Sequence, residues 1–268
     1  MGKGKPFLEL FASALHEDYR VPILETFAFL YTLGTFVVPS MGGAFPSATS
    51  GEAAAFDLVT SMTGLPLFIF FILMLKNLAY GLGTDLEKGV LQTLLSYPVK
   101  RYAILTAKLL SALGVALLLF LGIQMSAFYI LAPDIILPYF STVLLTYAAS
   151  LSYSLLIAGI MLLVTLVLKR GGLALVLGIV LYFLFGILSG LTMFLAFALE
   201  SPLPLQILSV LSPSVALHAY YHPAFMPFGG ELWSPSFWEA LAYVGTGYVT
   251  VIFLFLLGYF YFDRRLSM

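Results

Sequence analysis

Long apolar runs separated by short polar segments dominate the chain. A transmembrane helix needs about 20 consecutive, mostly apolar residues. Six runs have that length, and we expect transmembrane helices at residues 21–39, 57–77, 103–132, 138–168, 171–199 and 237–262. The pattern predicts an all-α integral membrane protein in which residues 1–268 form a single transmembrane domain.

The first run, residues 21–39, is followed by small residues and could be read as the apolar core of a signal peptide. It is long for such a core, and it begins some twenty residues into the chain. We therefore expect an uncleaved helix.

The segment 6–20 is too short to cross a membrane but has helical periodicity. One predicted face carries Phe7, Leu10, Phe11, Ala14 and Leu15, and the other carries mostly Glu9, Ser13, His16, Glu17 and Arg20. Such an amphipathic segment is typical of a helix that lies in the membrane interface. A frayed polar N-terminus is the alternative.

The segment 84–95 is polar, short and bounded by helix signals. Thr84 and Glu87 have the spacing of a capping box. We expect one helix from Asp85 to Leu95, ended before Pro98. Eleven residues rise only about 16 Å, half the thickness of a bilayer core. The helix should therefore lie on the membrane surface, with one predicted apolar half that contains Leu86, Val90, Leu91, Leu94 and Leu95.

The segment 200–236 holds six of the 14 prolines and is nevertheless rich in apolar residues. We expect short helices, broken at Pro213 and Pro223, that re-enter the outer leaflet before the last span. Non-helical backbone at that depth is tolerated only where it packs against protein.

Composition supports a membrane protein. The chain is 61% hydrophobic and 9% charged, with a mean hydropathy of +1.04, whereas soluble domains contain about 25% charged residues. It has no cysteine, which excludes disulfides and thiolate sites. A net charge of -1 gives no reason to expect nucleic acid as a partner.

The basic residues predict the orientation of the chain. All 12 fall on one predicted side: Lys3, Lys5, Arg20, Lys76, Lys88, Lys100, Arg101, Lys108, Lys169, Arg170, Arg264 and Arg265. The loops of the other side carry only acidic residues: Glu52, Asp57, Asp134, Glu200, Glu231 and Glu239. Because basic loops stay in the cytoplasm, we expect a multi-pass cell-membrane protein with cytoplasmic N- and C-termini.

Few residues suggest chemistry within the chain. His218 and His222 are four apart and could face one metal ion, with Glu231 as a third ligand; a plain helix face is the commoner explanation of that spacing. Gln124 and Asn77 are isolated polar groups that could form hydrogen bonds between helices. The spans lack midplane carboxylates, which disfavours a proton-coupled carrier.

The cytoplasmic segment resembles the signature of ABC-2 type transporter permeases. The pattern D-x-E-x-G-x-L-x-x-L-L-x-x-P-V-x-R matches Asp85, Glu87, Gly89, Leu91, Leu94, Leu95, Pro98, Val99 and Arg101, and Lys108 follows. Family members often have a second Glu where this chain has Gln92. The six spans, the interfacial helix and the outer re-entrant segment extend the resemblance to nearly the whole chain.

The resemblance implies the membrane subunit of an ATP-driven exporter. Two permease subunits, identical or related, would pair in the lipid membrane, and two ABC ATPase subunits would bind ATP and Mg. The 84–95 helix would couple them through Asp85, Glu87, Gly89, Val90, Leu91, Leu94 and Leu95, with Pro98 and Arg101 fixing the following bend. The chain has no G-x-x-x-x-G-K-[ST] phosphate loop, so we expect no enzyme activity and no cofactor in this subunit.

The composition of the spans suggests a substrate class. Spans rich in Phe, Tyr, Met and Leu suit a lipid-like, amphipathic or drug-like substrate, although the same residues also face lipid in any membrane protein. A membrane scaffold or sensor that signals through the same cytoplasmic helix is the main alternative.

Overall fold

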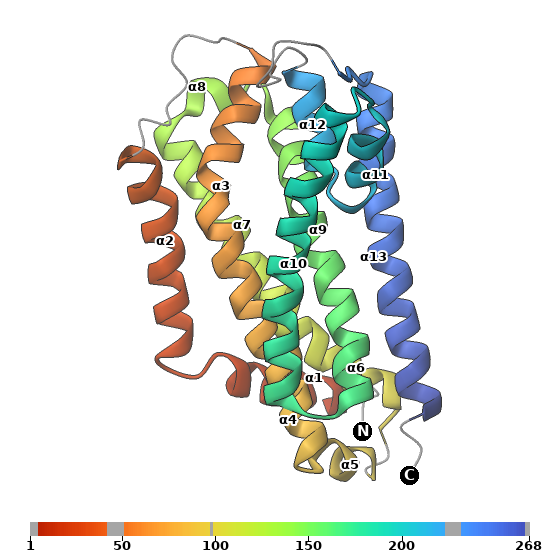
Figure 1. The fold of residues 1–268 in the computed structure, drawn as a ribbon. Helices are drawn as coiled ribbons and strands as arrows, with labels where there is room; N and C mark the ends of the chain where they lie inside the picture. Colours follow the sequence, from red (N-terminus) through yellow and green to blue (C-terminus); the bar gives the residue numbers. More distant parts are fainter. Residues whose placement is uncertain (1–4, 42–50, 97–98, 223–231, 266–268) are drawn as a thin grey trace.

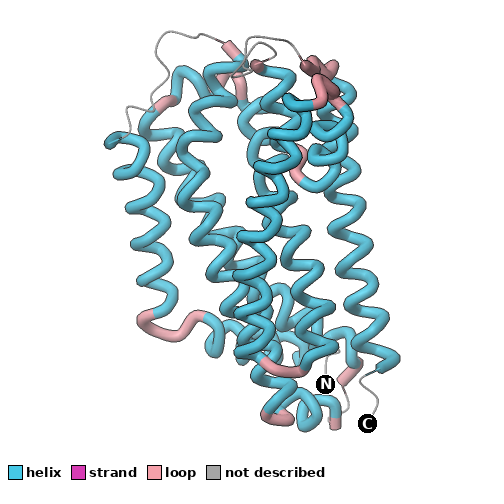
Figure 2. Tube along the Cα trace, viewed as in Figure 1, coloured by secondary structure: helices cyan, strands magenta, loops and turns pink. Residues whose placement is uncertain are grey.

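The computed structural model describes residues 5–41, 51–96, 99–222 and 232–265, and every regular element in these ranges is a helix. Six long helices run side by side (Figure 1): α2 (Ile23–Met41), α3 (Glu52–Leu75), α7 (Ala116–Leu131), α9 (Phe140–Leu168), α10 (Gly171–Ala198) and α13 (Phe237–Arg265). Figure 2 shows that helices make up nearly all of the described chain, with only short loops and turns besides. The expected all-α class is confirmed.

Shorter elements lie at the two ends of this bundle. One end has α1 (Lys5–Asp18), the π-helical turn η1 (Lys76–Gly81), α4 (Leu82–Glu87), α5 (Val90–Leu95), α6 (Arg101–Leu109) and a second π-helical turn, η2 (Leu110–Val115). The opposite end has α8 (Pro133–Ile136), α11 (Leu203–Leu211) and α12 (Ser214–Tyr221).

Five helices are long and apolar enough to cross a membrane. They are Glu52–Glu87, Arg101–Leu131, Phe140–Leu168, Gly171–Ala198 and Phe237–Arg264. The first of these joins α3, η1 and α4 without a break, and the second joins α6, η2 and α7. The run expected at 21–39 forms α2, whose apolar part Ile23–Val37 is shorter than the other five. The structure thus supports five of the six expected spans by length, and the sixth stays a prediction.

The two ends of the bundle differ in charge. The end that carries both chain termini in Figure 1 also carries the segments with the described Lys and Arg residues; we call it the basic end. The opposite end, where α3 and α13 begin and α10 finishes, carries Glu52, Asp57, Asp134, Glu200 and Glu239; we call it the acidic end. This grouping matches the charge pattern of the sequence. That the basic end is cytoplasmic stays a prediction.

The segments expected at 6–20 and 200–236 form helices. In α1, Ala14 is buried while Leu8, Glu9 and His16 are exposed, as a one-sided contact with the bundle requires. At the acidic end, α11 and α12 are separated at Ser212, next to the proline that the sequence identified as a break. Pro223, the other expected break, lies outside the described residues. Insertion of α11 and α12 into the outer leaflet stays a prediction.

The core lies between α3 and α9. Both helices are largely buried, and α9 packs against α3, α10 and α13. Bulky aromatic side chains fill the space, with Phe120 in edge-on contact with both Tyr31 and Tyr147. The apolar windows of α10 and α13 are only 17% and 22% buried. These two helices therefore offer broad apolar surfaces to whatever surrounds the chain.

One polar side chain joins three helices inside this core. Gln124 of α7 donates from Nε2 to Thr35 Oγ1 of α2 at 2.7 Å. Its Oε1 accepts a hydrogen bond from the Tyr147 hydroxyl of α9 at 3.0 Å. All three residues are buried, so the prediction that Gln124 bonds between helices is confirmed.

Replacing Gln124 tests this junction. Gln124→Leu keeps the side-chain bulk but removes a partner from two buried hydroxyls, which should cost about 1 kcal/mol. We expect the unfolding temperature of the purified chain in detergent to fall by a few degrees. Gln92→Leu, at an exposed position of α5, is the control. Equal unfolding temperatures for the two variants would contradict the assigned role.

Candidate functional site

The segment 84–95 is not one helix, which corrects the sequence prediction. The helix that begins at Glu52 continues through Thr84 to Glu87, so no helix begins at Thr84 and no capping box forms there. The break comes at Gly89, whose φ of 74° is left-handed and suits glycine. The short helix α5 then runs from Val90 to Leu95. We call residues 82–95 the elbow.

The elbow places its apolar residues on different sides. Leu86 and Leu91 are 3% and 1% exposed and belong to the main core. Leu94 and Leu95 are half-buried against that core. Val90 is 41% exposed, so the expected continuous apolar half is divided. The outer side of α5 is formed by Val90 together with the exposed Gln92 and Thr93.

Glu87 joins the elbow to the start of α10. Its Oε2 accepts a hydrogen bond from the backbone N–H of Gly171 at 3.3 Å. The first N–H groups of a helix lack partners within that helix and carry a partial positive charge, so a carboxylate suits this place. The sequence predicted that Glu87 caps its own helix; in the structure it lies at the N-terminus of another.

Two glycines permit this close contact. A Cβ atom added to Gly83 would lie 2.6 Å from Gly171 Cα, and one added to Gly171 would lie 2.6 Å from the Tyr80 carbonyl oxygen. The backbones of α4 and α10 therefore meet where no other residue fits. The elbow thus contacts the turn between α9 and α10 directly.

The other side of the elbow leads to α13. Arg101, the first residue of α6, donates from an Nη atom to the carbonyl oxygen of Asp263 at 3.0 Å. Asp263 lies near the end of α13. Pro98, which was expected to shape this bend, lies outside the described residues.

A cluster of ion pairs connects the elbow with α1 and α6, and the sequence did not predict it. Lys108 of α6 pairs with Asp85 of α4 at 2.7 Å and with Glu17 of α1 at 2.6 Å. Asp85 is 3% exposed, so its charge depends on Lys108. These two ion pairs join α1, the elbow and α6.

Asp18 forms a second polar contact beside the first. Its Oδ2 accepts a hydrogen bond from Ser111 of η2 at 2.5 Å, and its carbonyl oxygen accepts one from Lys76 of η1 at 2.7 Å. Burial raises the pKa of the Asp18 carboxyl to about 6, although the hydrogen bond from Ser111 and the charge of Lys108 act to lower it. The end of α1 therefore rests on both π-helical turns.

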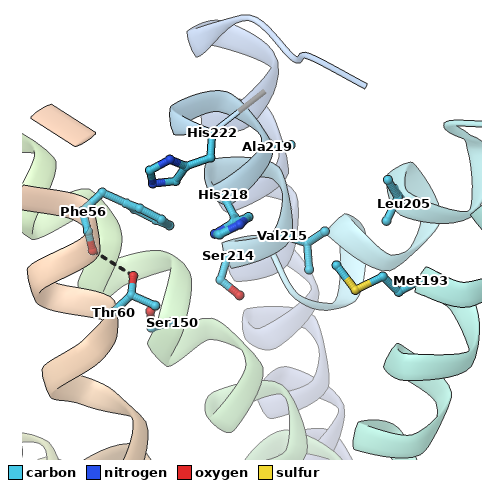
Figure 3. A pocket seen from close by; sticks show the side chains of 10 residues that line it. All are labelled: Phe56, Thr60, Ser150, Met193, Leu205, Ser214, Val215, His218, Ala219 and His222. Carbon is cyan, nitrogen blue, oxygen red and sulfur yellow. Dashed lines mark hydrogen bonds between the residues drawn. The ribbon is translucent and has the colours of Figure 1, made fainter. Parts of the chain in front are cut away.

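The two histidines lie at the acidic end, on and just after α12. His222 Nε2 is 2.6 Å from Asp57 Oδ1 of α3, and the rings of His218 and His222 are 5.3 Å apart. Both line a cavity of about 250 Å³ (Figure 3). Among the described residues, no three metal-ligand side chains come together. Glu231, the third ligand considered for a metal, lies outside them.

Comparison with known proteins identifies the family of this bundle of apolar helices. A family model described as "ABC-2 family transporter protein" matches residues 30–265. The chain belongs to this family. No curated protein and no solved structure matched it. The ABC-2 assignment thus rests on nearly nine tenths of the chain and identifies a membrane permease.

The structure groups the ABC-2 signature residues only in part. Asp85 is buried in an ion pair, Glu87 contacts α10, and Arg101 contacts α13. Gly89 ends a helix, and the apolar residues divide between core and surface. Long-range partners such as Glu17 and Gly171 carry no local sequence signal that could have identified them.

The contact between Gly83 and Gly171 predicts the effect of a methyl group. Gly83→Ala should force α4 away from α10 and cost about 1–3 kcal/mol, the usual range for overpacking. Gly172→Ala is the matched control, because a Cβ there meets nothing within 4 Å. Thermal unfolding in detergent should separate the two variants. A Gly83→Ala protein as stable as Gly172→Ala would contradict the close contact.

Asp18 predicts a pH dependence. Its folded-state pKa of about 6 exceeds the ordinary 3.8, so the folded chain binds this proton more tightly than the unfolded chain does. The stability contributed by Asp18 should therefore rise as the pH falls from about 7 to about 4. From pH 7.5 to pH 5, wild type should gain about 1 kcal/mol relative to Asp18→Asn.

The exposed residue Asp134 supplies the control for that comparison. Asp134→Asn should follow the wild-type pH profile, because this carboxylate lies on the surface at the opposite end. Parallel thermal-unfolding profiles for wild type and Asp18→Asn would show that Asp18 is not the titrating group.

Proposed function

We propose that this chain is the membrane subunit of an ATP-driven exporter and that the elbow binds a separate ATPase. The observation that carries the proposal is the position of α5. It is exposed on one side at the basic end, while its flanking residues contact α10 and α13. A partner that presses on α5 would therefore act on α10 and α13 through the contacts of Glu87 and Arg101.

The ATPase partner supplies the chemistry that this chain lacks. ATP and Mg would bind to two ABC ATPase subunits, one under each permease subunit, and the permease itself would hold no cofactor. The family assignment supports such a partner in general. The exposed groups nearest to it would be Glu87, Lys88 and the outer side of α5. Together they offer an acidic, a basic, an apolar and two polar side chains.

A second permease subunit, identical or related, would complete the transporter. The support for it is the broad apolar surface of α10 and α13, which is less buried than that of the other three helices long enough to cross a membrane. Membrane helices associate through close packing rather than through burial from water. Lipid would cover the rest of this surface. The basic end would face the cytoplasm, in keeping with the positive-inside rule.

The substrate proposed from the sequence is a lipid-like, amphipathic or drug-like molecule moved outward. Support comes from the largely apolar core of the bundle, in which the buried Gln124 is bonded to Thr35 and Tyr147. A hydrophilic solute would find few partners there.

An affinity pull-down tests the elbow as the ATPase contact. The tagged chain is recovered from its native membranes in mild detergent, and bound proteins are identified by mass. We expect an ATPase with wild type and about tenfold less with Glu87→Lys or Val90→Arg, because both place a new charge at the contact. The same variants should lose stimulation of ATP hydrolysis.

Two controls separate contact from folding. Glu200→Lys makes the same charge change on an exposed side chain at the acidic end, and it should recover the ATPase normally. Unfolding temperatures should show that the elbow variants are folded. If wild type repeatedly recovers no ATPase from membranes that contain one, the transporter proposal fails and a scaffold or sensor becomes the better explanation.

A further inference from the structure

The cavity at the acidic end has no role in the coupling described above. It lies where α3, α9, α10, α11 and α12 approach one another (Figure 3), and its volume is about 250 Å³. Pockets for drug-sized ligands usually measure 300–1,000 Å³. The cavity therefore has room for a small molecule or for part of a larger one.

One side of the cavity is apolar and adjoins the outer surface of the chain. Met193 of α10 and Leu205 of α11 lie on this side, opposite Phe56 in Figure 3. Next to them on the same helices, Phe194 and Ile207 are 67% and 59% exposed. Because this outer surface is apolar, a molecule that enters the cavity from the membrane must pass its apolar part between Met193 and Leu205.

The other side is polar and offers oxygen atoms that accept hydrogen bonds. The Thr60 hydroxyl donates its own hydrogen to the Phe56 carbonyl oxygen at 2.8 Å. Its oxygen lone pairs therefore face the cavity as acceptors. His222 lies at the rim and is bonded to the half-exposed carboxylate of Asp57.

A carboxylate lies next to this side: Asp57 does not itself line the cavity, but it contacts the lining residue His222. No Lys or Arg lines the cavity, and the described residues of the acidic end include none. Burial lowers the pKa of His218, with the neighbouring His222 acting in the same direction and Asp57 against both. The lining thus offers no fixed positive charge to an anion.

Aromatic rings add to this preference. Phe56 lies in the cavity wall, with its ring centroid 5.0 Å from that of Tyr221 and 5.9 Å from that of His222. The faces of aromatic rings attract cations within about 6 Å. Acceptor oxygens and an aromatic ring in the lining, with the Asp57 carboxylate held against the lining residue His222, form a typical environment for an ammonium group.

We propose that this cavity binds a cationic amphiphile. Its ammonium group would lie beside Asp57, Thr60 and Phe56, and its apolar chain would pass between Met193 and Leu205 toward the membrane. The inference deepens the proposed function, because it names a substrate class for the exporter, and it rests on that function only for the step of transport. Binding itself needs neither the ATPase nor the elbow.

Photolabelling of the full chain in lipid nanodiscs tests the site. The probe is a twelve-carbon alkyl trimethylammonium with a diazirine at the end of its chain; matched probes carry a hydroxyl or a sulfonate in place of the ammonium. We expect the cationic probe to label peptides that contain Met193 or Leu205 about fivefold more than either matched probe. Unlabelled dodecyltrimethylammonium should compete.

Two variants and one control sharpen the result. Asp57→Asn should reduce cationic labelling about fivefold and leave hydroxyl-probe labelling unchanged, because it removes the charge but keeps the shape. Ala219→Leu should abolish labelling of the cavity by filling it. Asp134→Asn, which changes an exposed carboxylate on α8 at the same end, should behave as wild type.

The opposite results overturn the proposal. Equal labelling of the cavity by all three probes would exclude a cationic preference, and labelling confined to the outer face of α13 would exclude the site. Because the assay contains no ATPase, failure here leaves the pull-down result standing. A failed pull-down likewise leaves the binding result standing.

Discussion

The ion pair between Lys108 and Asp85 is the interaction on which the basic end depends. The two side chains come from consecutive long helices, Glu52–Glu87 and Arg101–Leu131, and Asp85 is nearly inaccessible. A buried carboxylate without its cation is costly by several kcal/mol. The pair therefore fixes α4 against α6, and Glu17 extends the connection to α1. The elbow, α1 and α6 thus share one electrostatic centre.

The parts that the sequence predicted well are those governed by local composition. Runs of apolar residues predicted the long helices because a helix is the structure that satisfies its backbone within a single segment. Four of the expected spans agree with the structure within a few residues at each end; the helix around 57–77 extends further, from Glu52 to Glu87. The positions of Lys and Arg along the sequence were enough to predict that the basic loops lie at one end. These properties need no knowledge of which helices touch.

The parts that failed depend on contacts between distant residues. Thr84 and Glu87 have the same S/T-x-x-E spacing as Ser236 and Glu239, yet only the second pair forms a capping box. At Ser236 a helix does begin, whereas at Thr84 the preceding helix continues because Gly83 can pack on Gly171. Local spacing cannot distinguish these cases. The same holds for the acceptor of Ser111, which lies 93 residues away in Asp18.

The continuous helix from Glu52 to Glu87 determines how a displacement passes from one end of the chain to the other. Its 36 residues extend about 54 Å, well beyond a bilayer core of about 30 Å. A flexible linker between the span and the elbow would absorb a displacement by changing its own conformation, so less of the displacement would reach the span. A continuous helix has no such reservoir, since its backbone torsions are already fixed. Pro66 and the π-helical turn η1 are the places where this helix can bend, so a displacement at Glu87 reaches Phe56 through them.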